Sequence, residues 1–405
     1  MEGGSCRAAA ASAVLPVPDE LIVEILARLP AKSLCLCKCV SRAWRAFISD
    51  PANRRRFAQT LSGLFFSRPY GSRPTWDFVG LSMSSVLPPP PGVDAALSFL
   101  PPTCGEMELL DSCNGLLLLR CEDSRERPSP PPFYVVCNPA TGEWVALPQP
   151  SRVPGFVGYS TTVGRTMDTG SAALGFDPSI SPHFYVFQLV QVLTHLDFFV
   201  RAVEIYSSQT GRWVLSEIEL QGEMADESDY IHFTGQMTYF KGFLHLCMRF
   251  NAVVSVHTEG KTWKISQLRH RQHEGYCPVF SVCHSQGRLL FVDSNDRSSD
   301  VMSIYVLEDL DSEEWTWVFK QSIEKPDLFV PRMPQRIWDY DTAAFHPDSD
   351  LIFFYDWSQK RLVSYDMKHR DVHVICTLEV PYFEFRKFLP YVPLYSGALP
   401  SSCLN

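Results

Sequence analysis

The sequence predicts a two-part α+β chain, in which a small module of three helices precedes an all-β propeller of about six blades. Three observations support this prediction. Apolar residues recur at helical spacing between residues 15 and 48, and short β-rich runs separated by Gly, Asn, Asp and Pro begin at residue 61. These runs also repeat with a period near that of a propeller blade. We therefore expect a disordered tail at 1–13, the helical module at 14–60, the propeller at 61–399 and a tail at 400–405.

The first expected helix starts at Pro18 and stops at Pro30. Proline suits a first helical turn, where its missing N–H has no intrahelical partner, and Pro30 cannot continue the helix. Asp19 and Glu20 follow Pro18, at the end where the helix dipole favours anions. An apolar stripe along one face consists of Leu21, Ile22, Ile25, Leu26 and Leu29. This spacing predicts an amphipathic helix.

A second apolar stripe follows the short turn at 31–34 and ends at Asp50-Pro51. Its members are Leu36, Val40, Trp44, Phe47 and Ile48. Helices this short are marginal in water, and a unit of roughly 40 residues usually needs a disulfide, a metal or a partner to be stable. We therefore expect part of this apolar surface to bind another chain. The alternative is an ordinary helical subdomain that packs on its own chain.

The segment resembles the F-box, the helical module through which substrate receptors of SCF ubiquitin ligases dock on a Skp-type adaptor. The matching residues are 18–21 (Pro-Asp-Glu-Leu), 24–26 (Glu-Ile-Leu), 28–30 (Arg-Leu-Pro), 32–34 (Lys-Ser-Leu), 39–42 (Cys-Val-Ser-Arg) and Trp44. The chain departs from the usual plant pattern at Val17, a position commonly held by Leu. It departs again at 36–38, where Leu-Cys-Lys replaces a basic-aromatic-basic triplet.

The resemblance implies a docking surface for the Skp-type adaptor. Buried aliphatic and aromatic anchors carry most of the energy of an interface, so we expect the contacts to come from such residues. The candidates are Leu21, Ile25, Leu26, Leu29, Pro30, Leu34, Val40 and Trp44. Several of them will pack the small core of the module instead, and the sequence does not divide the two sets.

The composition indicates an intracellular protein without a membrane span. Thirteen cysteines are scattered without the spacing of a disulfide framework, and the short apolar run at 8–15 is a poor secretory signal. The sequence has no run approaching the roughly 18 apolar residues that span a membrane. The formal charge of −9 argues against general nucleic-acid binding, because phosphate contacts require a basic face. We expect a soluble protein of the cytoplasm and/or nucleus.

A recurrent unit of three apolar strands, the last ending near a tryptophan, runs through the remainder of the chain. The clearest copies begin at Gly235 and Val279 and align turn for turn, and five copies are recognisable. The tryptophans are Trp144, Trp213, Trp263 and Trp315. Their separations of 69, 50 and 52 residues are near the period of kelch-like blades once loop insertions are allowed. Segments 63–67 and 76–81, with the C-terminal 391–395, are expected to complete a sixth blade.

Closure into a ring follows from the physics of a sheet. A lone antiparallel sheet exposes its edges and an apolar face, whereas blades packed around an axis bury these faces and leave only short edges. The arrangement resembles the F-box-associated domain of plant F-box proteins. The resemblance includes Cys-Asn-Pro-Ala-Thr-Gly at 137–142 and Leu-Pro-Tyr-Val-Pro at 389–393.

The residues that could carry chemistry are better explained as structural. Gly260-Lys261-Thr262 lacks the preceding glycine and the following helix of a phosphate-binding loop, so we expect a hairpin turn there. One group has spacing that a zinc ion could tolerate, but it crosses a predicted blade junction and is more simply explained as loop histidines with buried cysteines. Its members are His270, His273, Cys277, Cys283 and His284. We expect no catalytic residue, no metal and no cofactor.

The combined prediction is a substrate-receptor subunit that makes no bonds itself. The resemblance implies that the adaptor joins it to a cullin and a RING subunit, which bring a ubiquitin-charged conjugating enzyme to the substrate. Aromatic residues in loops at one rim of the propeller suit the capture of a protein substrate, although packing between blades explains them equally well. They are Tyr159, Tyr230, Tyr276, Trp338 and Tyr340.

Two other classes of function stay open at this point. One is a scaffold that works without ubiquitin transfer, such as a lectin-like propeller. The other is a propeller enzyme, which would place a polar or metal cluster on the axis. The sequence does not identify the substrate.

Overall fold

The computed structural model divides into two compact units, Met1–Ala58 and Gln59–Asn405. The residues that it describes are 17–29, 33, 37, 40–49, 53, 61–69, 74–81, 89, 92–122, 131–151, 172–194, 197–217, 233–248, 252–268, 280–293, 301–310, 312, 315–324, 340–356, 359–378, 388–395 and 399.

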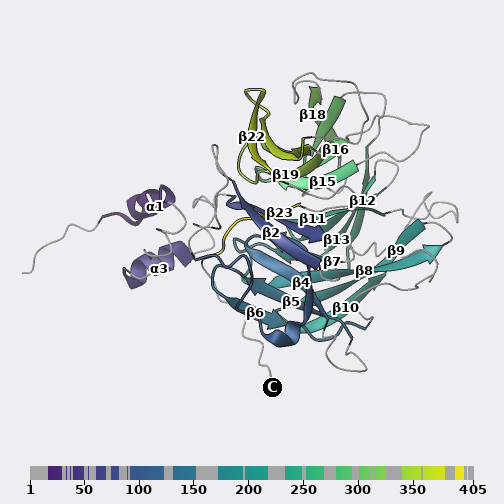
Figure 1. The fold of residues 1–405 in the computed structure, drawn as a ribbon, viewed down its shortest axis with the longest axis horizontal. Helices are drawn as coiled ribbons and strands as arrows, with labels where there is room; N and C mark the ends of the chain where they lie inside the picture. The colour runs from purple at the N-terminus through teal and green to yellow at the C-terminus, as the bar shows by residue number, and fades with distance from the viewer. Residues whose placement is uncertain are drawn as a thin grey trace, which may run out of the picture. The chain divides into compact units, whose positions relative to one another are not determined.

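The first unit contains the helices α1 (Asp19–Ala27) and α3 (Arg42–Ser49) (Figure 1). The carbonyl of Pro18 accepts hydrogen bonds from the N–H groups of Leu21 and Ile22, at 3.0 and 3.3 Å, so the helix begins where the proline predicts. The hydroxyl of Ser41 accepts a 3.1 Å bond from the N–H of Trp44, as an N-cap of α3. The rest of the predicted three-helix module falls largely outside the described residues and stays a prediction.

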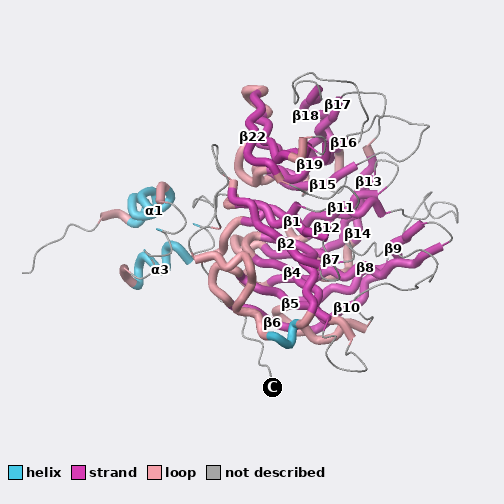
Figure 2. The backbone as a smooth tube through the Cα atoms, in the orientation of Figure 1, coloured by secondary structure: helices cyan, strands magenta, loops and turns pink. Residues whose placement is uncertain are grey.

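The second unit is a β-propeller in which each blade is an antiparallel sheet (Figure 2). Blade 1 comprises β3 (Glu106–Cys113), β4 (Leu116–Glu122), β5 (Phe133–Asn138) and β6 (Glu143–Ala146), and blade 2 comprises β7 (Ala172–Phe176), β8 (Phe184–Thr194), β9 (Asp197–Ser207) and β10 (Arg212–Glu217). Blade 3 comprises β11 (Phe233–Phe240), β12 (Phe243–Met248), β13 (Ala252–His257) and β14 (Trp263–Gln267). Blade 4 comprises β15 (Phe280–Ser285), β16 (Arg288–Asp293), β17 (Val301–Leu307) and β18 (Trp317–Glu324). Blade 5 comprises β19 (Tyr340–Phe345), β20 (Leu351–Asp356), β21 (Arg361–Asp366) and β22 (Asp371–Thr377).

A sixth sheet, the closing blade, joins the two ends of this unit. It contains β1 (Gly63–Pro69), β2 (Pro74–Gly80) and β23 (Phe388–Tyr391), in the order β2-β1-β23. The innermost strands contact one another in cyclic order, from β3 through β7, β11, β15 and β19 to β23 and back to β3. The prediction of six blades is therefore confirmed.

The last strand of the closing blade begins earlier than the sequence suggests. Segment 391–395 was the expected strand, but β23 ends at Tyr391 and residues 392–395 leave the sheet. They pack against blade 1 instead, where the side-chain amide of Asn138 donates a 2.9 Å hydrogen bond to the carbonyl of Leu394. Asn138 therefore contacts the residue just after the 389–393 motif, and Cys137 and Tyr391 share one apolar cluster, so the two motifs meet where the ring closes.

Burial follows the position of a strand within its blade. The second strands are apolar runs enclosed on both faces, as in β4, where Leu116 to Leu119 are fully buried. The outermost strands β10 and β22 alternate between exposed and covered positions. Large apolar side chains that stay exposed on outer strands are Val214, Leu215, Ile265, Val318, Phe319 and Val374. The core therefore lies between blades, and the outer strands are its border.

Tryptophans at the start of outer strands connect neighbouring blades. The indole N–H of Trp213 donates to the carbonyl of Pro148 at 2.7 Å, and that of Trp263 donates to the hydroxyl of Ser216 at 2.8 Å. Trp317 repeats the contact with Ser266 at 3.1 Å. The sequence analysis placed Trp315 in the repeat of tryptophans, but Trp315 is buried and its indole N–H donates to the carbonyl of Leu310 within its own blade. The repeat position in blade 4 is therefore Trp317.

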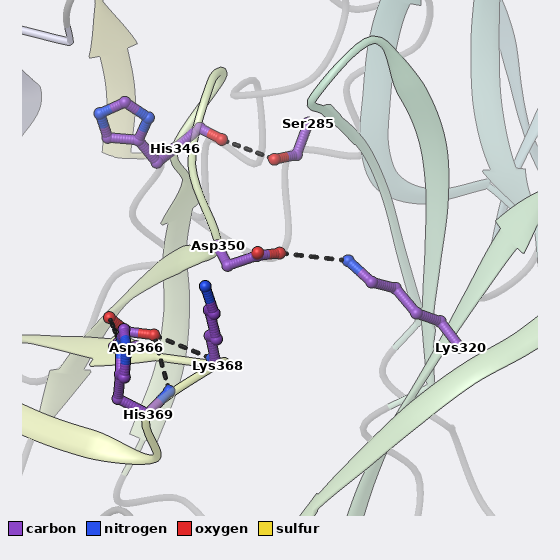
Figure 3. Close-up of polar contacts among 7 residues, drawn as sticks. All are labelled: Ser285, Lys320, His346, Asp350, Asp366, Lys368 and His369. Carbon is purple, nitrogen blue, oxygen red and sulfur yellow. Dashed lines mark hydrogen bonds and ion pairs between the residues drawn. The ribbon is translucent and has the colours of Figure 1, made fainter.

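The junction of blades 4 and 5 shows how turns hold blades together (Figure 3). The hydroxyl of Ser285 donates a 2.6 Å hydrogen bond to the carbonyl of His346, and Lys320 Nζ lies 3.5 Å from Asp350 Oδ1. Within the turn after β21, the carboxylate of Asp366 accepts hydrogen bonds from the N–H groups of Lys368 and His369. The contacts of Ser285 and Asp366 join side chains to backbone, so they fix the turns without a regular ladder.

Candidate functional site

The exposed face of α1 is the candidate docking site in the first unit. Leu21 and Ile25 are 54% and 55% exposed, and Val40, in the turn before α3, is 65% exposed. Val17, four residues before Leu21, is 51% exposed and lies just before the helix. Residues four apart lie one above the other on a helix, so Leu21 and Ile25 form a continuous apolar line. Burying two such side chains beneath a partner would contribute about 1 to 2 kcal/mol each.

The opposite face of α1 packs the core of the same unit. Leu26 is fully buried, and it contacts Val23 and Ile48, which are also buried. Partly buried side chains around them are Ile22, Ala27, Leu29, Cys37, Trp44 and Phe47. The helix is apolar on two faces, and only one of them faces its own core.

The predicted docking residues therefore separate into three groups. Leu21, Ile25 and Val40 are exposed and available to a partner. Leu26 belongs to the core, and Leu29 and Trp44 border it. Pro30 and Leu34 lie outside the described residues. Sequence reasoning missed the exposed Val17 as a candidate, although its position four residues before Leu21 was a signal.

Charges flank the exposed line on α1. Arg28 Nη2 lies 3.2 Å from Glu24 Oε1, one helical turn away. Both side chains are largely in water, so the pair stabilises the helix by only about 0.3 to 0.5 kcal/mol. Glu20 is exposed as well. An apolar line bordered by charged residues resembles the core and rim of a protein interface.

The predicted substrate-binding aromatics fall mostly outside the described residues. This applies to Tyr159, Tyr230, Tyr276 and Trp338. Tyr340 is the first residue of β19, and its backbone pairs with Asp356 of β20. The rim of the propeller as a substrate site stays a prediction.

Polar contacts between innermost strands were not predicted from the sequence. The carboxylate of Asp111 in blade 1 accepts a 2.9 Å hydrogen bond from the N–H of Leu174 in blade 2. Between blades 3 and 4, the hydroxyl of Thr238 lies 3.0 Å from Nδ1 of His284. Burial lowers the pKa of His284, although the carboxylates of Asp111 and Asp177 act in the opposite direction. These groups hold blades together, and they could be found only once the strands are paired.

Two members of the candidate zinc group, Cys283 and His284, lie among the described residues. His284 lies on β15 and stacks on the ring of Phe240 at 5.5 Å between centroids, so it is a strand residue and not the loop histidine that we expected. Burial raises the pKa of Cys283, which favours its neutral thiol over a metal-binding thiolate. His270, His273 and Cys277 lie outside the described residues. Among the described residues, no three His, Cys, Asp or Glu side chains are grouped so as to hold a metal ion.

Comparison with known proteins agrees with both units. Residues 15–56 match the F-box domain family, and residues 93–380 match the family described as F-box protein At3g26010-like, beta-propeller. The chain is 26% identical over 358 residues to F-box protein At5g07610 of Arabidopsis thaliana, covering 81% of this chain and 77% of that protein. It is also 26% identical to F-box protein At3g26010 of the same plant, covering 86% of this chain and 77% of that protein.

In the part of the chain that the structure describes, no helix is both long enough and apolar enough to cross a bilayer.

Proposed function

Because the chain belongs to the family of At3g26010-like F-box β-propeller proteins, we propose that it is a substrate-receptor subunit of an SCF-type E3 ubiquitin ligase. F-box domains generally bind Skp-type adaptors, and an F-box followed by a propeller suggests a substrate receptor. The observation that carries the proposal is the exposed line of Leu21 and Ile25 on α1, together with the exposed side chain of Val40. It gives a small helical unit an apolar surface that a partner would cover.

In this proposal the chain supplies proximity and no bond-making residue. The adaptor binds the module at 14–60 and connects it to the cullin and RING subunits. The propeller at 61–399 holds a protein substrate beside the ubiquitin-charged conjugating enzyme. Holding two reactants together replaces a bimolecular encounter with one at high effective concentration. F-box proteins of this type act in the cytoplasm and/or nucleus, where we place this chain.

The proposal is tested by measuring the affinity of the full-length protein for a purified Skp-type adaptor by calorimetry. Leu21→Asp and Ile25→Asp should each weaken binding at least about tenfold, because each places a carboxylate in a desolvated contact. Both side chains are exposed, so the helical unit should stay folded in each variant. Unchanged hydrogen-exchange protection of α1 and α3 would show this. The matched control is Val214→Asp, which changes an equally exposed valine on β10 and should leave the affinity unchanged.

Two results would overturn the proposal. Unchanged affinity in the Leu21→Asp, Ile25→Asp double variant would remove the docking face. Adaptor binding without co-purification of a cullin would instead favour the scaffold that works without ubiquitin transfer.

A further inference from the structure

Three buried cysteines meet in blade 1 beneath the closing blade. Cys104 ends the short 3-10 helix η1 (Pro102–Cys104), Cys121 lies on β4 and Cys137 lies on β5. Each is at most 1% exposed, and all three belong to one apolar cluster that also contains Phe65 and Tyr391 of the closing blade. The mechanism proposed for the chain gives these thiols no task.

The backbone brings Cys104 and Cys121 side by side. Gly105 and Glu122, the residues that follow the two cysteines, form a parallel β-bridge. This bridge is isolated, because β3 itself pairs with β4 in the antiparallel sense from Glu106 onward. A disulfide requires Cα atoms roughly 4.4 to 6.8 Å apart. The bridge beside both cysteines and the apolar cluster that they share bring the two thiols into this neighbourhood.

The side chains confirm this proximity and make the two thiols unequal. A hydrogen bond joins the thiols of Cys104 and Cys121; it lowers the pKa of Cys104 and raises that of Cys121. Burial raises the pKa of Cys137. The thiolate is the reactive form of cysteine, so the pair holds one thiol suited to attack and one suited to resolve the product. Cys137 lies in the same cluster, but no hydrogen bond to another thiol shifts its pKa.

We propose that Cys104 and Cys121 are an oxidation site, which a peroxide converts reversibly into a disulfide. The thiolate of Cys104 attacks one peroxide oxygen, which breaks the O–O bond and gives a sulfenic acid and hydroxide; the hydroxide takes up the proton that Cys104 lost. The thiol of Cys121 then attacks the sulfenic sulfur, the S–S bond forms and water leaves. Two thiols and one hydrogen peroxide thus give one disulfide and two waters.

The position of the site explains what the disulfide would do. It would tie the start of β3 to β4, and β3 is the innermost strand that contacts β23 across the closure of the ring. The peroxide reaches the pair by opening of η1, a single turn held by the bonds from Cys104 N–H to Pro101 and from Gly105 N–H to Pro102. A cross-link constrains the unfolded chain, so the oxidised propeller should be more stable than the reduced one. This inference does not rest on adaptor binding.

The test uses the full-length protein treated with hydrogen peroxide, followed by alkylation and peptide mass spectrometry. We expect a Cys104–Cys121 linked peptide that dithiothreitol removes, and a rise of about 3 °C or more in the melting temperature of the propeller. Cys104→Ala and Cys121→Ala should abolish both changes. The matched control Cys137→Ala removes an equally buried thiol from the same cluster and should keep both.

The linked peptide in the wild-type protein decides the question even if a variant fails to fold. Full alkylation of Cys104 and Cys121 after peroxide treatment would overturn the proposal, and so would a disulfide through Cys137.

Discussion

The helical unit and the propeller both expose large apolar side chains, but they differ in the core behind them. In the helical unit, Leu21 and Ile25 are exposed on α1, and the buried apolar side chains that the structure describes there are Val23, Leu26 and Ile48. In the propeller, exposed residues such as Phe319 lie on outer strands, beside clusters that run from blade to blade. Exposed apolar surface beside a small core indicates a unit that needs a partner. The same surface beside a large core is only the border of a blade.

The largest effect that we predict comes from the core of the helical unit. Leu26→Ala should cost about 2 to 5 kcal/mol, because it leaves a cavity beside the buried side chains of Val23 and Ile48. A unit this small cannot lose that much free energy of unfolding and stay folded. Hydrogen-exchange protection of α1 and α3 should therefore disappear, while the propeller strands keep theirs. The control is Leu21→Ala, which removes an exposed side chain and should change protection little. Preserved protection of α1 in Leu26→Ala would show that the two units do not differ in this way.

The next effect tests the ring closure of the propeller. Gly115 has φ of +90°, and a Cβ there would lie 2.6 Å from the backbone N of Leu394 and 2.7 Å from the carbonyl oxygen of Val392. Gly115→Ala should therefore lower the free energy of unfolding by about 3 kcal/mol in urea denaturation. Gly287→Ala is the matched control, since Gly287 has φ of +69° in a similar turn with open space around its Cβ position. It should cost only about 1 kcal/mol. Equal losses would mean that residues 392–395 do not support the closure.

Much of the propeller could be predicted because its signals are local. Short apolar runs, turn residues and the spacing of tryptophans were enough to predict the repeated blades and the two N-terminal strands of the closing blade. The contact of Asn138 with Leu394 was beyond reach, because it joins motifs that are far apart in the chain. The same holds for Cys104 and Cys121, whose neighbourhood depends on the turn of η1 and on a bridge that no spacing rule describes.

The helical unit illustrates a different limit. Leu21 and Leu26 are both apolar and both fit a helical period, so both were equally good docking candidates before the fold was known. Their roles differ because Ile48 of α3 packs against one face of α1 and not the other. Which face is covered depends on the tertiary contact between two helices, and a helix that is apolar on two faces carries no local signal for it.

The smallest effect that we predict concerns the contact between outer strands of neighbouring blades. The hydroxyl of Ser216 accepts from the indole N–H of Trp263 at 2.8 Å and donates to the carbonyl of Gly260 at 2.5 Å. Trp263→Phe removes the indole bond together with part of a ring that packs against the core, and Ser216→Ala leaves two groups without their partner, so each should cost about 1 to 2 kcal/mol. The double variant should lose less than the sum of the two, because both changes remove the same bond. Denaturant unfolding of the four proteins measures this coupling. Additive losses would show that the tryptophans merely border the blades, and the propeller would then owe its self-sufficiency to the inner strands alone.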